Sequence, residues 1–347
     1  MKQFIIYWVN FVTTTLAVTH PTLLDVMART KPDGGIDMIA EILNQTNAML
    51  DDAVWVEGNL TTGHKTTVRA GIPAPTWRKL YGGVQPTKST TAQITDSCGM
   101  LEAYAEVDKA LADLNGNTAE FRMSEDTPHI EGMSQEIAST AFYGNEMTEA
   151  EAFTGFAPRF NDTTAQNGDN IIQNGTTPDT SIWLVVWGPN TVHMIYPKGS
   201  AAGLQREDKG QVTIENIDGA NGRMEAYRTH YRWDAGLTVR DWRYVVRIQV
   251  DLSEVLFNAA SGPNLIDLMQ QAVDLVPNLG AGRPVFYCSR SLMSLLRRQV
   301  MNKVAGGTLT MEDIRRPNGI TIKVPAVDGI PVRRVDALAT TEADLTP

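Results

Sequence analysis

The sequence predicts an α+β protein, because three kinds of pattern occupy separate parts of the chain. Residues 57–98 contain no helical stripe and are rich in threonine, glycine and proline. Residues 222–250 alternate large apolar side chains with basic ones, which is the two-residue period of a half-buried strand. Residues 124–143 and 265–276 carry apolar side chains three and four positions apart, as amphipathic helices do. Separate strand and helix stretches are typical of an α+β fold.

The composition allows a substantial core. The chain has 347 residues, of which 42% are hydrophobic, so we expect one to three domains. Its formal net charge of −10 argues against general wrapping of nucleic acid. The two cysteines, Cys98 and Cys288, are far apart, so neither a disulfide framework nor a structural zinc site is expected. A reducing cytoplasm is the natural compartment for such a chain.

The charges are unevenly distributed. Residues 100–152 hold twelve carboxylates against only Lys109 and Arg122, whereas residues 283–334 hold ten basic residues against three acidic ones. One interpretation is a set of solvated helix faces. The other is a protein whose copies pack head to tail, with an acidic surface against a basic one.

The first residues allow three interpretations. Phe4–Val12 is apolar behind Lys2, like a weak signal sequence, but it is too short to span a bilayer. Alternatively, the biological start lies near Leu16 or Ala17, or the segment is an arm that docks on a neighbour. We favour an extension or an arm over a signal.

Residues 36–50 predict an amphipathic helix that ends near Asp52, and residues 54–56 open an extended segment. Residues 57–98 then predict a long two-stranded hairpin with Trp77–Val84 at its tip. Because an isolated two-stranded ribbon is marginal in water, it needs a partner surface. Trp77 and Tyr81 favour docking over a flexible loop, since such side chains supply large contact areas at low entropic cost.

The rest of the chain mixes helices and strands. A second helix is expected over residues 100–114, and a third begins at Ser124 with Pro128 in its first turn. Further strands are expected at 182–187, 192–196, 285–288, 320–324 and 330–332, and further helices at 265–276 and 292–300. The strand at 182–187 is apolar on both faces, as in a covered central strand.

The basic segment is interpreted as a second hairpin. Arg228 and Arg232 precede Ala235–Gly236, and Arg243 and Arg247 follow it. Two strands around this glycine turn predict a wet, basic face, which suits contact with another large molecule.

No catalytic or metal-binding pattern is present. The sequence lacks the glycine-rich phosphate loops, the HExxH zinc motif and the GxSxG nucleophile motif. The five histidines are scattered, and His193 within an apolar strand is expected to be a core residue. We therefore predict no enzyme, no cofactor and no metal.

Several short motifs follow one another in a distinctive order: Thr22–Val26, Gly71–Arg78, Gln85–Thr91, Phe142–Asn145, Phe156–Phe160, Tyr231–Ile248 and Gly329–Asp336. In this order they resemble the major capsid proteins of tailed bacteriophages, specifically the podophage branch with gp-seven-like capsid proteins. The resemblance spans residues 17–340.

The resemblance implies the Johnson capsid fold, with an N-terminal arm, an extended two-stranded E-loop, a long spine helix, and peripheral and axial domains. The spine helix would be residues 124–143, with 100–114 the alternative. The implied parts are an N-terminal extension and arm (1–53), the E-loop (54–98), the spine helix with the peripheral-domain β region (99–250), and an axial-domain-like α/β region with closing strands (251–347).

The function so implied is a major capsid protein that assembles as hexamers and pentamers into an icosahedral shell around packaged double-stranded DNA. Its partners would be copies of itself, with scaffold, portal and decoration proteins, and no membrane. It would assemble in the bacterial cytoplasm and reside in the virion. An encapsulin-like nanocompartment and a neck or tail component are the alternatives. The candidate subunit-interface residues are Trp77, Arg78, Lys79, Tyr81, Arg228, Arg232, Arg243 and Arg247.

Overall fold

The computed structural model describes residues 45–114, 118–175, 177–215, 222–255, 264–301, 309–315, 321–343 and 345. The chain divides into two compact units. The described part of the first comprises 102–131 and 206–231, with gaps, and the second takes the remainder. Helix α4 (Thr118–Tyr143) and strands β3 (Thr90–Asp108) and β8 (Arg223–Val239) contribute residues to both units.

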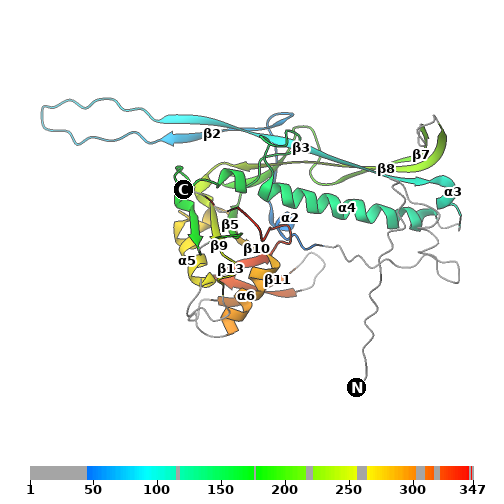
Figure 1. The fold of residues 1–347 in the computed structure, drawn as a ribbon. Coiled ribbons are helices and arrows are strands. Elements are labelled where there is room, and N and C mark those ends of the chain that lie inside the picture. The colour runs from blue at the N-terminus through cyan, green and yellow to red at the C-terminus, as the bar shows by residue number, and fades with distance from the viewer. Residues whose placement is uncertain are drawn as a thin grey trace, which may run out of the picture. The chain divides into compact units, whose positions relative to one another are not determined.

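Strand β5 (Thr180–Trp187) is the central strand of the second unit and is buried along its whole length. It pairs antiparallel with β9 (Val245–Val250) and with β10 (Arg283–Cys288), so both of its edges are covered. This confirms the prediction of a covered central strand. The sheet continues from β10 through the closing strands β13 (Ile330–Arg334), β12 (Thr321–Val327) and β11 (Leu309–Arg315) (Figure 1). Through β6 (Val192–Tyr196) it reaches β8, while the short strands β1 (Trp55–Glu57) and β4 (Ile171–Asn174) pair with β6 and β9.

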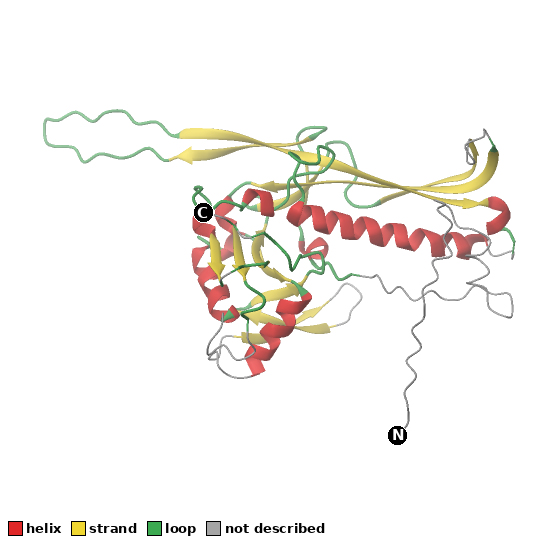
Figure 2. Cartoon of the chain, in the orientation of Figure 1, coloured by secondary structure: helices red, strands yellow, loops and turns green. Residues whose placement is uncertain are grey.

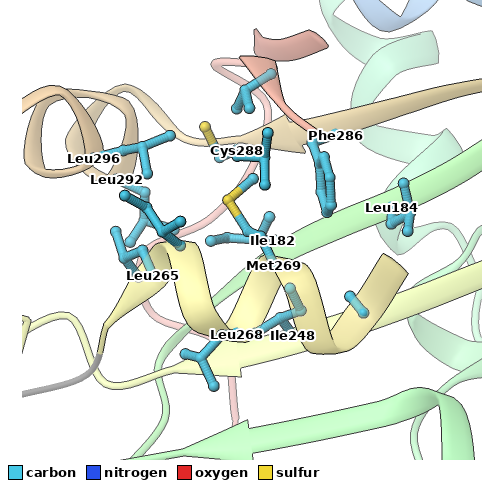
Figure 3. Close-up of a cluster of buried hydrophobic side chains, with 14 of the residues drawn as sticks. Ile182, Leu184, Ile248, Leu265, Leu268, Met269, Phe286, Cys288, Leu292 and Leu296 are labelled. Atoms are coloured by element: carbon cyan, nitrogen blue, oxygen red, sulfur yellow. The ribbon is translucent and has the colours of Figure 1, made fainter. Parts of the chain in front are cut away.

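Two helices supply one apolar layer on this sheet. They are α5 (Leu265–Leu275) and α6 (Arg290–Met301), in agreement with the predicted stripes. Their side chains meet alternate residues of β5 and residues of β9 and β10, as Figure 3 shows for Leu265, Leu268, Met269, Leu292, Leu296, Ile182, Leu184, Ile248, Phe286 and Cys288. Helix α5 begins with the side chain of Asn264 accepting a hydrogen bond from the backbone N–H of Ile266.

The other face of β5 carries an aromatic layer. Trp183, Val185 and Trp187 alternate with the residues of the first layer, as the strand period requires. They pack against buried aromatic side chains from α4, from the connection that follows it and from β10: Phe142, Phe156, Phe160 and Tyr287. The connection around Phe156 therefore fills the core.

A buried ion pair lies beside the aromatic layer. Arg247 is 3% exposed, and its guanidinium lies 2.7 Å from Glu342 and 5.1 Å from the ring centroid of Trp183. It also donates to the backbone carbonyl of Phe160 at 2.7 Å. Burial and the adjacent Glu342 carboxylate raise the pKa of Tyr143, so its hydroxyl stays protonated and donates to Glu342. This network ties the C-terminal segment to β9 and to the end of α4.

The predicted basic hairpin is wrong. β8 continues through Ala235 and Gly236 without a turn and pairs with β6, whereas β9 pairs with β4 and β5. A Cβ atom on Gly236 would lie 2.5 Å from the carbonyl oxygen of Ser97, so this glycine permits a close backbone approach instead of a turn. β9 is buried on both faces, so the expected wet face does not exist there.

The predicted helix over 100–114 is also wrong. Strand β3 runs to Asp108, and only Lys109–Ala112 (α3) is helical. Met100 and Tyr104 are 68% and 50% exposed, whereas Ala105 and Val107 are 3% exposed. The same sequence fits a helical stripe and a two-residue alternation, and the pairing of β3 with β8 favours the strand.

The spine helix is confirmed and is longer than predicted. Helix α4 spans 26 residues from Thr118, so Pro128 lies inside the helix and not in its first turn. Because proline has no N–H, the carbonyl of Ser124 loses its helical donor. Of the helix predicted over 36–50, only the end is described, as α2 (Met49–Asp52). The remainder of that helix, and the first-residue interpretations, lie outside the described residues.

The first unit contains its own ion pairs. Strand β7 (Gln205–Glu215) pairs with β8, and a small apolar cluster forms around Val107 and Phe121. Arg122 meets Asp208 at 2.7 Å, and Arg206 meets Asp126 at 3.0 Å. Part of the acidic surplus of residues 100–152 is therefore neutralised within the unit.

We expect Arg247→Met to lower the free energy of unfolding of the unassembled subunit by about 3 kcal/mol, since it leaves Glu342 buried without its cation. Denaturant unfolding measures this. Arg243→Met is the control: Arg243 is 54% exposed, so its loss should cost less than about 1 kcal/mol. Adding Glu342→Gln to Arg247→Met should recover part of the loss, and equal effects of the two single arginine variants would contradict the role of the network.

Candidate subunit interface

The E-loop is a two-stranded hairpin, as predicted. Strand β2 (Gly63–Gly71) pairs antiparallel with the first half of β3, from Gly63 opposite Ser97 to Gly71 opposite Thr90. Residues 72–89 continue beyond the strand ends as an extended loop, shown in green in Figure 2. The loop contains a tight turn in which the N–H of Gly82 donates to the carbonyl of Lys79 at 3.0 Å.

The tip of the loop is uncovered. Trp77 and Tyr81 are 101% and 104% exposed, and Leu80 is 88% exposed. Arg78 and Lys79 lie between them and are exposed as well. Folding of the subunit thus leaves a contiguous apolar and cationic surface in water, which in soluble proteins marks an interaction site. The structure brings together four of the predicted interface residues here: Trp77, Arg78, Lys79 and Tyr81.

The base of the hairpin is fixed by polar contacts. Arg159 meets the buried Asp96 of β3 at 2.9 Å and donates to the carbonyl oxygens of Thr154 and Leu237. Asn59 and Lys65 exchange two hydrogen bonds of 2.7 and 2.8 Å across the start of β2. The base of the ribbon is therefore held in place, although its end is uncovered.

The four predicted arginines do not share one basic face. Arg228 lies in the first unit, 2.5 Å from Glu106 and over the ring of Tyr104. Arg232 pairs with Asp234 at 2.9 Å, and Arg243 pairs with Asp241 at 2.7 Å. The prediction that Arg247 lies on the surface is wrong, because β9 is covered on both sides and Arg247 is buried. An interface role for Arg228, Arg232 and Arg243 stays a prediction.

A cavity of about 840 Å³ beside the hairpin base is lined by Arg159, Arg240 and Arg243, among others. Arg240 donates to the carbonyl of Pro189 and to the side chain of Asn190. Together with the pairs of Arg159 and Arg243 described above, these contacts give each of the three guanidinium groups partners within the subunit.

A second cavity, of about 420 Å³, was missed by the sequence reasoning. Its lining is apolar at Met100, Ile137 and Trp233 and acidic at Glu149 and Glu151. The two-residue alternation of β3, with Met100 outward, is the signal that could have located it. The predicted helix over 100–114 concealed that signal.

Burial keeps the two thiols and the core histidine uncharged. Burial raises the pKa of the Cys98 and Cys288 thiols to about 12, so both stay protonated at neutral pH. Burial lowers the pKa of His193 to about 4, in agreement with its predicted place in the core. Among the residues that the structure describes, no group of His, Cys, Asp and Glu side chains could hold a metal, and no helix is long and apolar enough to cross a membrane.

Comparison with known proteins gives consistent results. Residues 31–346 match the family model of the major capsid protein GP7. Among solved structures, a chain from the near-atomic cryo-EM structure of bacteriophage Epsilon15 has a TM-score of 0.76 and 35% identity, covering 96% of this chain and 100% of that chain. A chain of the bacteriophage JBD30 capsid has a TM-score of 0.47 and 10% identity, covering 86% of this chain and 92% of that one. No curated protein matches the sequence.

The family model covers nearly the whole chain, and the Epsilon15 chain is similar over its full length. The α+β phage capsid fold predicted from the order of the sequence motifs is thereby confirmed, with the hairpin and α4 in the places expected for the E-loop and the spine helix. The chain belongs to the major capsid protein GP7 family.

Proposed function

We propose that this chain assembles as hexamers and pentamers into an icosahedral shell that encloses packaged double-stranded DNA. The observation that carries the proposal is the hairpin loop of residues 72–89, whose tip leaves Trp77, Leu80 and Tyr81 in water. Such a loop lowers its free energy only against another molecule, and in a closed shell every copy has an identical neighbour to supply that surface.

Membership of a capsid protein family implies a structural role, and we propose further that the chain catalyses no reaction. The shell would assemble in the cytoplasm of the bacterial host, with scaffold, portal and decoration proteins as further partners. The division into an arm (1–53), an E-loop (54–98), a spine and peripheral region (99–250) and an axial region (251–347) stays part of this proposal.

Electron microscopy of the purified protein, with nuclease-protection analysis of native particles, tests the function. Closed shells of uniform size that protect double-stranded DNA are expected. A ring of fixed small subunit number would indicate a neck or tail component. Shells without DNA that enclose a protein cargo would indicate an encapsulin-like compartment, and either result would overturn the proposal.

We expect the double variant Trp77→Ala/Tyr81→Ala to fold normally and to assemble poorly. Both side chains are fully exposed in the subunit, so its free energy of unfolding should be unchanged, whereas each aromatic anchor lost from an interface costs about 2 kcal/mol. Sedimentation of assembly mixtures measures the fraction in shells. The control Met123→Ala removes a 72% exposed apolar side chain outside the loop and should assemble like the wild type. Normal shells from the double variant would exclude the tip as an anchor.

Assembly should weaken as salt is raised. If copies pack with an acidic surface against a basic one, their attraction is screened by salt, and the screening length falls from about 10 Å at 0.1 M to about 3 Å at 1 M ionic strength. We expect the fraction of subunits in shells to fall several-fold over this range, measured by light scattering, with an uncharged solute at equal osmolality as the control. Assembly that is indifferent to salt would contradict charge pairing between subunits.

A further inference from the structure

The apolar and acidic cavity of the second unit has the chemistry to receive the loop tip. Its floor includes the buried Ile137 and Phe153, and the 68% exposed Met100 stands beside them. A volume of about 420 Å³ is in the range of concave sites that enclose large apolar groups. The side chain of Trp77 or Tyr81 is the kind of anchor that fills such pockets.

The charges at its rim are opposite to those of the tip. Glu136, Glu149 and Glu151 line the cavity and are exposed, and no ion pair joins them to any residue that the structure describes. The loop tip places Arg78 and Lys79 between its two aromatic side chains. A cationic, aromatic tip and an acidic, apolar cavity are therefore complementary in both respects.

The basic residues near the C-terminus are less available for these carboxylates. Arg283 and Arg333 pair with the buried Asp52 at 2.9 and 3.1 Å. Arg290 and Arg334 pair with Asp336 at 3.2 and 2.5 Å. These four cations from the basic segment of residues 283–334 are thus engaged in ion pairs within their own subunit, two to each carboxylate.

The tip extends away from the cavity of its own subunit. β3 is one continuous strand, so Met100 lies about 33 Å along the ribbon from Thr90, at a rise of about 3.3 Å per residue. Gly71 pairs with Thr90 at the same end of the ribbon. Trp77 follows Gly71 by only six residues, which span at most about 22 Å when fully extended. Because the loop continues beyond the strand ends, away from Met100, the tip that occupies the cavity has to come from another copy in this arrangement.

We propose that the E-loop tip of one subunit, residues Trp77–Tyr81, docks in the cavity formed by Met100, Ile137, Trp233 and the Glu149–Glu151 turn of a second copy. The pairing rests on the proposed shell function and names the surface that the loop contacts. The aromatic side chains occupy the apolar floor, while Arg78 and Lys79 face the carboxylates at the rim.

Charge reversal tests the pairing. Arg78→Glu/Lys79→Glu and Glu149→Lys/Glu151→Lys should each lower the fraction of subunits in shells about ten-fold, because each contact then brings like charges together. Combining all four substitutions restores opposite charges and should restore assembly. The control Asp169→Lys/Asp274→Lys makes the same charge change as Glu149→Lys/Glu151→Lys, but at exposed positions outside the cavity lining. It should assemble normally. Circular dichroism of each variant verifies folding.

A second readout does not depend on assembly yield. In a Cys98→Ser background, mixing subunits that carry Lys79→Cys with subunits that carry Glu149→Cys should give a disulfide-linked pair on oxidation, and either subunit alone should not. Wild-type shells without charge rescue and without this cross-link would overturn the docking site and leave the shell function intact. A wild-type chain that never forms shells would overturn both the shell function and the docking site. Normal assembly of Glu149→Lys/Glu151→Lys would likewise overturn the docking site.

Discussion

The β2–β3 ribbon depends on a surface that its own subunit does not supply. Two strands have two faces and no interior, so the ribbon can bury apolar area only against another body. The Arg159–Asp96 pair holds the base of the ribbon, while Trp77 and Tyr81 at its end remain in water. The base of the loop is consequently held by contacts within the subunit, whereas its tip has no surface that covers it. Identical neighbours in an assembly can each supply such a surface.

The core that holds the base of the loop consists of two apolar layers that share β5. Alternate residues of this strand face helices α5 and α6 on one side and an aromatic layer on the other, so a shift of one residue would exchange the two layers. Arg247 is tolerated inside this core because Glu342, a backbone carbonyl and the face of Trp183 surround its guanidinium. The C-terminal segment is thereby fastened to the same core that holds the hairpin base.

Local patterns predicted most of this arrangement where one period was unambiguous. The apolar run at 182–187 and the stripes at 265–276 and 292–300 appear as β5, α5 and α6. The hairpin over 57–98 was also predictable, because its composition excludes a helix and demands a partner. The capsid fold was predicted from the order of the short motifs, since no single motif was specific enough to predict it.

The incorrect predictions have physical causes. Residues 100–114 satisfy both the helical and the strand period, and the pairing of β3 with β8 selects the strand up to Asp108. Gly236 was taken for a turn, but close approach of the Ser97 backbone requires a glycine within a straight strand. Arg247 was placed on a wet face because its partner, Glu342, is 95 residues away in the sequence. Long-range pairing of this kind leaves no local signal.

Long-range pairing also changes the interpretation of the charge pattern. From sequence, an acidic segment and a basic segment suggested two opposed surfaces, yet ion pairs within the subunit occupy many of these charges. Asp52 and Asp336 hold four arginines of the basic segment. The carboxylates of Glu149 and Glu151 remain at the mouth of an apolar cavity. The cations presented on an extended loop beside two uncovered aromatic rings are Arg78 and Lys79. A contact between loop tip and cavity is therefore a local one, in which charge sets the register and the aromatic side chains supply the buried area.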